Sequence, residues 1–412
     1  MTSTPGAAGC PAHTSGGLLP LSATTMTREP EKVLQRLRQD WGSVAQVELE
    51  PGVPAWLVIG YREILTVARR ENLYSRDARN WRLFQDGTVP PDSALGPMMF
   101  YRPNVIGADG AEHRRLRRPL DDGVAAIDQR RMRRAVEALC TRLVSRFVER
   151  GHAELVGEYA TVIPSLALAD LFGFDAGESD ELVSSLRALF GSAEDALEGN
   201  RRFERLLRRV VQDRATAPAD DLTTRLLQHP DLRDEEEVVQ SMAILLSVSQ
   251  EATSDWISQS LRVMLTDSRF VGRMRGGRLG VDDALDEVLW RTPPVSNVPA
   301  RYALADTELA GRMIKKGDAL ILGVAGANQD PAVLGDGSAQ EQGNRAHLAW
   351  SAGPHACPAR TPARLIAHTA VKTVLHMLPD IRLTIPAEEI PLHFSPWMYG
   401  PKSLPVSFTP RS

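Results

Sequence analysis

One cysteine stands where a polypeptide can hold a thiolate. Cys357 follows a loop-like stretch, 349–356, and precedes a long helical pattern of apolar residues that includes Ala363. The pattern predicts that Cys357 lies at a helix N-terminus, with Pro358 in the first helical position. Backbone N–H groups and the helix dipole favour a thiolate there. Such a thiolate is a good axial ligand for haem iron, although an inert cysteine is the commoner outcome without further context.

Two other groups of polar residues have a spacing that suits chemistry. His113 and Arg117 are four residues apart on a predicted helix, so they share one face and can reach the same anionic group. Glu251 interrupts an apolar helical pattern over 242–265, close to the polar Ser249. An acid in such a helix fits a proton path better than it fits a solvent-facing charge pattern.

The composition is that of an ordinary globular protein. The chain has 412 residues, of which 43% are hydrophobic and 24% charged. A net charge of −4 argues against a dedicated nucleic-acid binder. Three scattered cysteines argue against a disulfide framework and a zinc site, and an odd number suits a reducing cytoplasm. No apolar run approaches the ~18 residues of a membrane span. We therefore expect a cytoplasmic protein that binds neither nucleic acid nor membrane.

Hydrophobic periodicity predicts a large helical body with small sheets near each end of the chain. Residues 44–60 are typical of a hairpin around a Glu-Pro-Gly turn, and a helix is expected to follow from Tyr61. Between Glu112 and Met274, hydrophobic periodicity predicts that the chain is mostly helical. Residues 295–325 and 380–410 are strand-like, with Gly and Pro between the strands.

The domain organisation is expected to be simple. Residues 1–25 are rich in small and polar residues and lack the pattern of a signal peptide, so we expect a disordered tail. Residues 26–412 show neither an internal repeat nor a clear linker, and we expect one domain. The Pro- and Gly-rich stretch 84–103 contains apolar residues, Phe100 among them. Such a loop often lines a binding site, and a surface loop partly packed on the core is equally compatible.

The cysteine loop resembles the haem-binding loop of cytochromes P-450, F-G-x-G-x-H-x-C-x-G-x-x-L-A-R. The positions that match are Gly353, His355, Cys357, Ala363 and Arg364. Trp350 stands in place of the Phe, and the resemblance implies that it covers the sulfur side of a haem. The positions that differ otherwise are Ser351, Ala359 and Pro362.

Further segments resemble this superfamily in the same order along nearly the whole chain after residue 40. They are 109–118, 301–311, 327–331 and 400–406. The resemblance implies a mainly α fold with small β-sheets, in which a triangular helical body surrounds a buried haem b. It also implies that His113 and Arg117 bind one haem propionate and that Arg301 and His355 bind the other.

The Glu-x-x-Arg motif of the superfamily is broken here. The chain reads Glu287-Val288-Leu289-Trp290, with Arg291 one position late, which resembles an actinobacterial subgroup of these enzymes. Residues three and four apart are both neighbours on a helix, so Arg291 can still pair with Glu287. If Glu287 is buried, it needs a partner, and Arg345 is a candidate.

The oxygen-binding helix departs as well. The segment 248–253 aligns with Ala-Gly-x-Glu/Asp-Thr-Thr, but Ala252 replaces the threonine, and Thr253 lies about 100° further around the helix. The resemblance implies that Glu251 relays protons and that Ser249, Ala252 and Thr253 shape the oxygen pocket. The residues expected to contact substrate are Val248, Asn297, Met398 and Phe100.

The resemblance implies an oxidising haem-thiolate enzyme that uses O₂ and electrons from a ferredoxin-type donor. Without a hydroxyl at position 252, chemistry in which the substrate supplies a polar group is favoured. We therefore expect tailoring of a small-molecule or short-peptide natural product, preferably by oxidative cross-linking of aromatic side chains. Two alternatives stay open. They are hydroxylation of a small apolar metabolite and a haem-binding relative that does not oxygenate.

Overall fold

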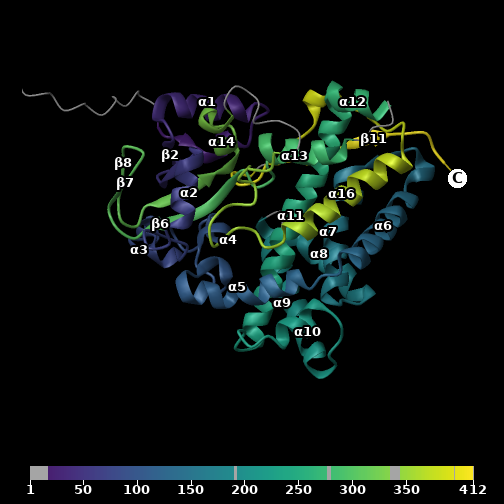
Figure 1. The fold of residues 1–412 in the computed structure, drawn as a ribbon, viewed down its shortest axis with the longest axis horizontal. Helices are drawn as coiled ribbons and strands as arrows, with labels where there is room; N and C mark the ends of the chain where they lie inside the picture. Colours follow the sequence, from purple (N-terminus) through teal and green to yellow (C-terminus); the bar gives the residue numbers. More distant parts are fainter. Residues whose placement is uncertain (1–16, 190–192, 276–279, 335–343, 394, 412) are drawn as a thin grey trace, which may run out of the picture.

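The computed structural model describes residues 17–189, 193–275, 280–334, 344–393 and 395–411. A helical body occupies most of the molecule, and a mixed sheet flanked by α1 and α2 lies at one side (Figure 1). The outline in Figure 1 narrows towards α10, which gives the body a triangular shape. The predicted mainly α fold with small sheets is confirmed.

The helices account for the periodic segments of the sequence. They are α1 (Pro30–Trp41), α2 (Tyr61–Arg69), α3 (Arg82–Gln85), α4 (Gly96–Met99), α5 (Gly110–Ala125), α6 (Gln129–Ser145), α7 (Val162–Phe172), α8 (Ala176–Leu189), α9 (Ala193–Thr216), α10 (Leu222–Leu227), α11 (Glu235–Thr266), α12 (Ser268–Arg275), α13 (Val281–Arg291), α14 (Val324–Asn328), α15 (Pro331–Leu334) and α16 (Arg360–Met377). The predicted helix start at Tyr61 is confirmed, as is the helical character of most of Glu112–Met274.

The strands form three small sheets. They are β1 (Leu19–Pro20), β2 (Val44–Glu48), β3 (Pro54–Val58), β4 (Tyr74–Ser75), β5 (His152–Glu154), β6 (Asn297–Ala303), β7 (Thr307–Leu309), β8 (Arg312–Ile314), β9 (Ala319–Gly323), β10 (Arg382–Leu383) and β11 (Pro405–Ser407). The largest sheet has the order β1-β2-β3-β9-β6-β4. Strands β2 and β3 pair antiparallel, with Val44 opposite Val58, so the predicted hairpin is confirmed. A second sheet has the order β10-β11-β5, and β7 pairs with β8.

The predicted disordered tail, residues 1–25, extends too far along the chain, because its last residues are ordered. Strand β1 pairs parallel with β2. Leu21 is fully buried, and the Thr25 hydroxyl donates to the Ser395 carbonyl over 2.6 Å. Burial of Leu21 and this link to the C-terminal region order residues 19–25. Residues 1–16 lie outside the described residues.

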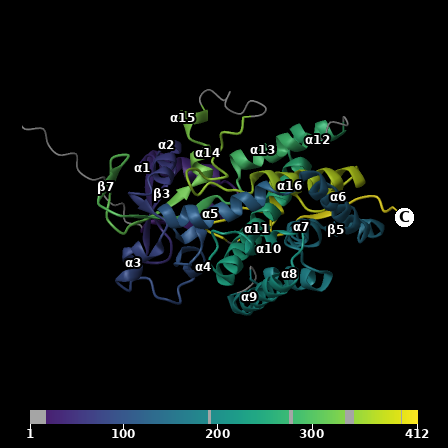
Figure 2. The same ribbon diagram turned by 60° about the horizontal axis from the view of Figure 1, so that its bottom comes forward.

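Helix α11 is the longest element of the described chain and runs through the helical body (Figures 1 and 2). Its N-terminus is capped by Asp234, whose side chain accepts the Glu237 N–H, and acidic residues fill the first turn. With 32 residues it is about 48 Å long. It packs against α7, α9, α13 and α16, so it can present residues to the centre of the molecule.

The predicted loop 84–103 is only partly irregular, because it contains the short helix α4 and the end of α3. Leu95 and Met99 are 4% and 2% exposed, and the rings of Phe84 and Phe100 lie 4.6 Å apart between centroids. Much of this segment therefore packs on the core. Within the described residues, every helix is too short or too polar to cross a membrane.

Candidate functional site

The cysteine loop is closed by a backbone hydrogen bond and by close packing of main chain on main chain. The Cys357 N–H donates to the Trp350 carbonyl over 2.9 Å. Gly353 has a φ of +68°, and a Cβ atom there would lie 2.2 Å from the carbonyl oxygen of Ala68. Glycine is required at this position for both reasons. Ser351 adopts a φ of +58°, a left-handed conformation that strains a residue with a side chain.

Trp350 connects the cysteine loop to α11. Its ring packs edge-on against Trp256, with the ring centroids 5.3 Å apart. The Trp256 indole N–H donates to the Leu285 carbonyl of α13 over 3.0 Å, which fixes that ring in turn. These contacts therefore fix the loop that carries Cys357 against α11 and α13.

The helix after the loop begins later than the sequence predicted. Helix α16 starts at Arg360, with Ala359 at its N-cap, so Pro358 precedes the helix and its predicted place in the first helical position is wrong. The physical reason is local, because Ala359 has φ −96° and ψ 25°, which lies outside the α region. Cys357 thus lies directly before the turn at 358–359 that leads into α16.

The pKa of the Cys357 thiol is determined mainly by burial. Burial raises its pKa, and this effect outweighs the Ala359 N–H and the charges of Arg360 and Arg117, which act in the opposite direction. The predicted stabilisation of a free thiolate by the helix start is therefore too weak by itself. A coordinated metal ion deprotonates a thiol outright, so the sulfur suits a metal–thiolate bond better than a free anion.

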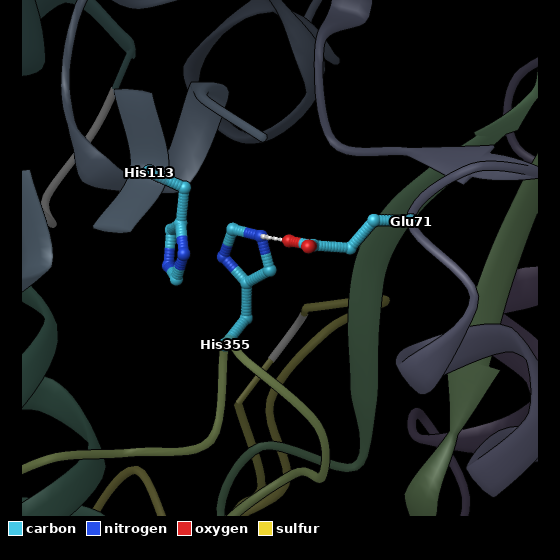
Figure 3. Close-up of side chains that lie close together, drawn as sticks. All are labelled: Glu71, His113 and His355. Atoms are coloured by element: carbon cyan, nitrogen blue, oxygen red, sulfur yellow. Dashed lines mark ion pairs between the residues drawn. The ribbon is translucent and has the colours of Figure 1, made fainter. Parts of the chain in front are cut away.

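Two histidines predicted to bind one cofactor lie against each other (Figure 3). His113 comes from α5 and His355 from the cysteine loop, and their ring centroids are 3.9 Å apart. His113 is 2% exposed, and neither of its ring nitrogens has a hydrogen-bond partner among the described residues. His355 Nε2 lies 3.7 Å from Glu71 Oε1 and 3.8 Å from Asp109 Oδ1. A buried polar surface of this kind requires a further partner.

Guanidinium groups adjoin these imidazoles. Arg301 on β6 is 2% exposed, and its hydrogen bond to the Ala300 carbonyl is long, at 3.4 Å. Burial holds the pKa of Arg301 well below its ordinary value, and burial lowers the pKa of Arg76 to about 10. Arg117 reaches the loop directly, because its Nη1 donates to the Pro354 carbonyl over 3.0 Å.

The electrostatics of this cluster favour an anionic ligand. Burial lowers the pKa of His113 to about 4 and that of His355 to about 3, and Arg301 adds to both effects. An anion would offset the unpaired positive charge and accept hydrogen bonds from both imidazoles. Glu71, His113 and His355 each place one ligand atom within 4.8 Å of the others, a spacing that could hold a metal ion. The neighbouring guanidinium groups disfavour a cation there, whereas the carboxylates of a haem would fit.

The residues of α11 that were predicted to form the oxygen pocket do not all lie on one face of the helix. Val248, Ser249, Glu251 and Ala252 are partly or well exposed, whereas Thr253 is 4% exposed. Successive residues point about 100° apart, which places Thr253 away from the face that Val248 and Ala252 share. Burial raises the pKa of Glu251 to about 7. This carboxyl can therefore take up and release a proton near neutral pH.

The residues expected to contact substrate separate in the structure. Met398 belongs to an extended buried apolar cluster, and Ala252 and Phe100 pack against the same cluster. Val248 is 49% exposed on α11. Asn297 has another role, because its side-chain amide donates to Thr24 Oγ1 and to the Pro396 carbonyl, each over 2.8 Å.

Asn297 therefore ties the N-terminal segment to the C-terminal loop. It is 1% exposed, so the predicted substrate contact is not supported for this side chain. No local pattern predicts these hydrogen bonds, since the two partners lie near opposite ends of the chain.

The broken Glu-x-x-Arg motif is replaced by two neighbouring ion pairs. Glu287 pairs with Arg291 Nε at 2.6 Å, as the spacing allowed, and with Arg269 Nη2 at 2.9 Å. The predicted partner Arg345 pairs instead with Asp286, at 3.3 Å, because Asp286 faces the segment that carries Arg345. Trp290, in place of the arginine, donates to the Asn344 carbonyl over 2.8 Å and meets His347 edge-on.

Comparisons with known proteins agree with this geometry. Cytochrome P450-SU2 of Streptomyces griseolus is 29% identical over 371 residues, which covers 89% of this chain and 90% of the relative. The 2-hydroxy-5-methyl-1-naphthoate 7-hydroxylase of Streptomyces carzinostaticus is 26% identical over 397 residues, covering 92% and 94%. No protein-family model matches the chain.

A solved structure shows the same fold. Steroid-bound CYP154C4 from Streptomyces sp. ATCC 11861 superposes with a TM-score of 0.84 at 24% identity, covering 92% of this chain and 96% of that one.

Proposed function

Because the chain belongs to the cytochrome P-450 superfamily, we propose that Cys357 would bind the iron of haem b through its thiolate and that the enzyme tailors an aromatic natural product. Haem b, the cofactor of this superfamily, supplies the activation of O₂ when it is bound. The enzyme is a monooxygenase of the haem-thiolate class and takes its electrons from a redox partner. The unpartnered ring nitrogens of buried His113, next to Arg301 and the cysteine loop, support this assignment most strongly.

The cofactor residues act through charge and position. His113, Arg117, Arg301 and His355 would hold the propionates by charge-assisted hydrogen bonds, which would remove the cost of burying these groups without a partner. Trp350 covers the sulfur side, where its contact with Trp256 keeps the ring in place. The Cys357 N–H is already engaged with the Trp350 carbonyl, so the loop is preorganised for its ligand.

The proton chemistry rests on Glu251. Its pKa near 7 lets the carboxyl hold a proton and release it from the partly exposed face of α11. Ser249 and Ala252 border that face and shape the oxygen pocket. Thr253 supports the pocket from the buried side. Its hydroxyl is too far around the helix to replace the one missing at position 252.

We propose that the reaction is oxidative cross-linking of aromatic side chains in a short peptide. A phenol brings its own hydroxyl, which can accept and donate the hydrogen bonds that Ala252 cannot make. Two aryl hydrogens leave, one new bond forms between the rings, and O₂ is reduced to two waters with two electrons and two protons from outside. Met398, Phe100 and Val248 provide the apolar contacts for the rings.

Hydroxylation of a small apolar or aromatic metabolite is the second candidate. The printed name of the Streptomyces carzinostaticus relative describes a hydroxylase of a naphthoate. Met398 and Phe100 would suit a single flat ring system as well. In this reaction one oxygen atom enters the substrate, and the other leaves as water.

A ferredoxin-type protein fits as the electron donor. A cavity of about 710 Å³ opens on the face that carries the start of α16. Its lining is rich in basic side chains, and it also contains Asp282, which pairs with Arg364. The basic residues are Arg133, Arg345, Arg360, Arg364, His347 and His368. Ferredoxins are acidic, and an electrostatic match raises the rate of association.

Product analysis tests the proposed reaction. The holoenzyme, a ferredoxin, its reductase and NADPH would be incubated with short peptides rich in Tyr, Trp or His, and separately with naphthoates. Mass spectrometry would find loss of two hydrogen atoms if the rings are joined. A gain of one oxygen atom, without loss of two hydrogens from any peptide, would replace cross-linking by hydroxylation.

A charge-reversal pair tests the donor surface. Arg133→Glu, at the basic cavity, should raise the ferredoxin concentration needed for half-maximal turnover by roughly tenfold at low salt. The matched control Arg205→Glu alters an exposed arginine of α9 and should change it little. Equal effects of the two variants would contradict docking at the cavity.

A further inference from the structure

A second carboxyl group lies one helical turn from Glu251. Asp255 is 3% exposed, and its Oδ2 has no hydrogen-bond partner among the described residues. Residues four apart are neighbours on one helix face, so the two carboxyl groups face the same side of α11. A Cβ atom at Gly400 would lie 2.7 Å from Asp255 Cγ, so the missing side chain at position 400 leaves the space that this carboxyl occupies.

His393 joins this buried carboxyl to the surface. Its Nε2 lies 3.2 Å from Asp255 Oδ1. The His393 side chain is 37% exposed, whereas that of Asp255 is 4% exposed. The backbone N–H of His393 donates to the Gly400 carbonyl over 3.0 Å, which fixes the imidazole beside the carboxyl. His393 therefore connects solvent to Asp255, which shares one face of α11 with Glu251.

The charges along this line suit proton exchange. Burial raises the pKa of Asp255, although His393 acts against it. Burial works to lower the pKa of His393, but the hydrogen bond and charge of Asp255 and the charge of Glu251 outweigh it, so the pKa is raised. Lys402 is the other charged group that acts on His393, and it lowers the pKa.

The reaction needs a supply of protons. Reduction of O₂ in each turnover consumes two electrons and two protons, whichever of the two products forms. Glu251 can give up one proton and must then be reprotonated. Its neighbour Thr253 points elsewhere, and Ala252 has no group that could exchange a proton.

We propose that His393 and Asp255 deliver protons from solvent to Glu251, which makes them the outer part of its proton path. The proposal rests on the role assigned to Glu251 above. His393 Nε2–H gives its proton to Asp255 Oδ1, Asp255 passes its proton from Oδ2 by way of one water molecule to the Glu251 carboxylate, and His393 takes a new proton from a solvent acid such as hydronium. We call these three residues the proton relay. No net charge accumulates, because Asp255 is reprotonated by His393 and His393 by solvent.

The test compares two oxidants with one probe substrate, guaiacol, in the holoenzyme. NADPH with ferredoxin and its reductase supplies electrons only, so protons must come from solvent. Hydrogen peroxide brings the oxygen, the electrons and the protons together, so it bypasses proton uptake. His393→Gln and Asp255→Asn would be compared with the control His376→Gln, which changes an exposed histidine in the last turn of α16.

Both relay variants should lose about tenfold or more of the NADPH-driven rate and keep the peroxide-driven rate within about twofold. Their solvent deuterium isotope effect on the NADPH-driven rate should rise, and the control should match the wild type. Equal losses with both oxidants would show a structural role and overturn the relay. Unchanged rates and isotope effects in both variants would overturn it as well.

A measurement without turnover separates the relay from the proposed function. The His393 imidazole would be titrated by NMR in the folded protein. Its pKa should lie above the ordinary value in the wild type and fall below it in Asp255→Asn, where only the effect of burial remains together with Glu251 and Lys402. An unchanged titration would overturn the coupling. Absence of guaiacol oxidation with either oxidant in a wild type that titrates as expected would instead count against the proposed oxidase function.

Discussion

The guanidinium of Arg364 on α16 forms an ion pair with the carboxylate of Asp286 on α13, with Nη1 and Oδ1 2.5 Å apart. The pair is largely buried, since the side chains are 21% and 13% exposed. It joins the helix behind the cysteine loop to the helix that carries the broken Glu-x-x-Arg motif. Asp286 also pairs with Arg345 at 3.3 Å, so one aspartate holds two arginines from the segments around the cysteine loop.

Asp286→Asn should therefore destabilise the enzyme more than Glu287→Gln. Loss of Asp286 leaves Arg364 without its main partner inside the protein and should cost about 2 kcal/mol. Glu287 pairs with Arg269 and Arg291, which are 56% and 43% exposed, so its loss should cost about 0.5 kcal/mol. Urea unfolding of both holoenzymes measures the difference. A larger loss of unfolding free energy in Glu287→Gln than in Asp286→Asn would contradict this prediction and would show that Glu287 contributes more to stability.

In the cysteine loop, removing one glycine should destabilise the protein, whereas introducing a glycine at a second position should not. Gly353→Ala places a methyl group against the Ala68 carbonyl at a positive φ and should cost about 3 kcal/mol or more, with loss of bound haem. Ser351→Gly relieves the left-handed strain and should be neutral or stabilising by up to about 1 kcal/mol. Thermal unfolding and haem content would be recorded together. Comparable losses in both variants would contradict the loop geometry.

The stability of the protein should depend on pH through Glu251. Its pKa rises from 4.5 to about 7 on folding because of burial, so the folded state binds more protons than the unfolded state between these values. This contribution is fully present below about pH 4.5 and is lost as the pH rises through about 7. The difference in melting temperature between Glu251→Gln and the wild type should shift in favour of the variant over that range. A constant difference would contradict the raised pKa.

Arg301→Leu should leave the cofactor-free protein as stable as before or more stable, but it should weaken the retention of haem in the haem-bound protein. In the cofactor-free protein it removes a buried guanidinium whose charge is poorly compensated, so stability should rise or stay level. In the haem-bound protein it removes a propionate partner, and haem should dissociate roughly tenfold faster. Unfolding of the cofactor-free protein and haem transfer to apomyoglobin measure the two effects. Destabilisation of the cofactor-free form with unchanged haem dissociation would assign Arg301 a purely structural role.

Local patterns allowed much of the architecture to be predicted. The hairpin at Val44–Val58, the helix from Tyr61 and the length of α11 follow from periodicity and turn residues near in sequence. The start of α16 could not be predicted, because it depends on the backbone angles of Ala359 within a loop packed on α2. Likewise, the order of residues 19–25 comes from contacts with the far end of the chain.

The site was predicted best where a motif fixes a residue and least where only tertiary contacts do. His113 and His355 do lie together, and their motifs are specific. Asn297 was assigned to the substrate, but it binds Thr24, which no local pattern indicates. His393 and Asp255 were missed for the same reason, since a lone histidine in a C-terminal loop gives no sign of its partner.

The absorption spectrum of the reduced protein with carbon monoxide tests the central assignment most directly. The wild type should give the long-wavelength band typical of a thiolate-bound haem, and Cys357→Ser should lose that band while it can still hold haem through the propionate cluster. Retention of the same band and of the same activity in Cys357→Ser would contradict ligation by Cys357.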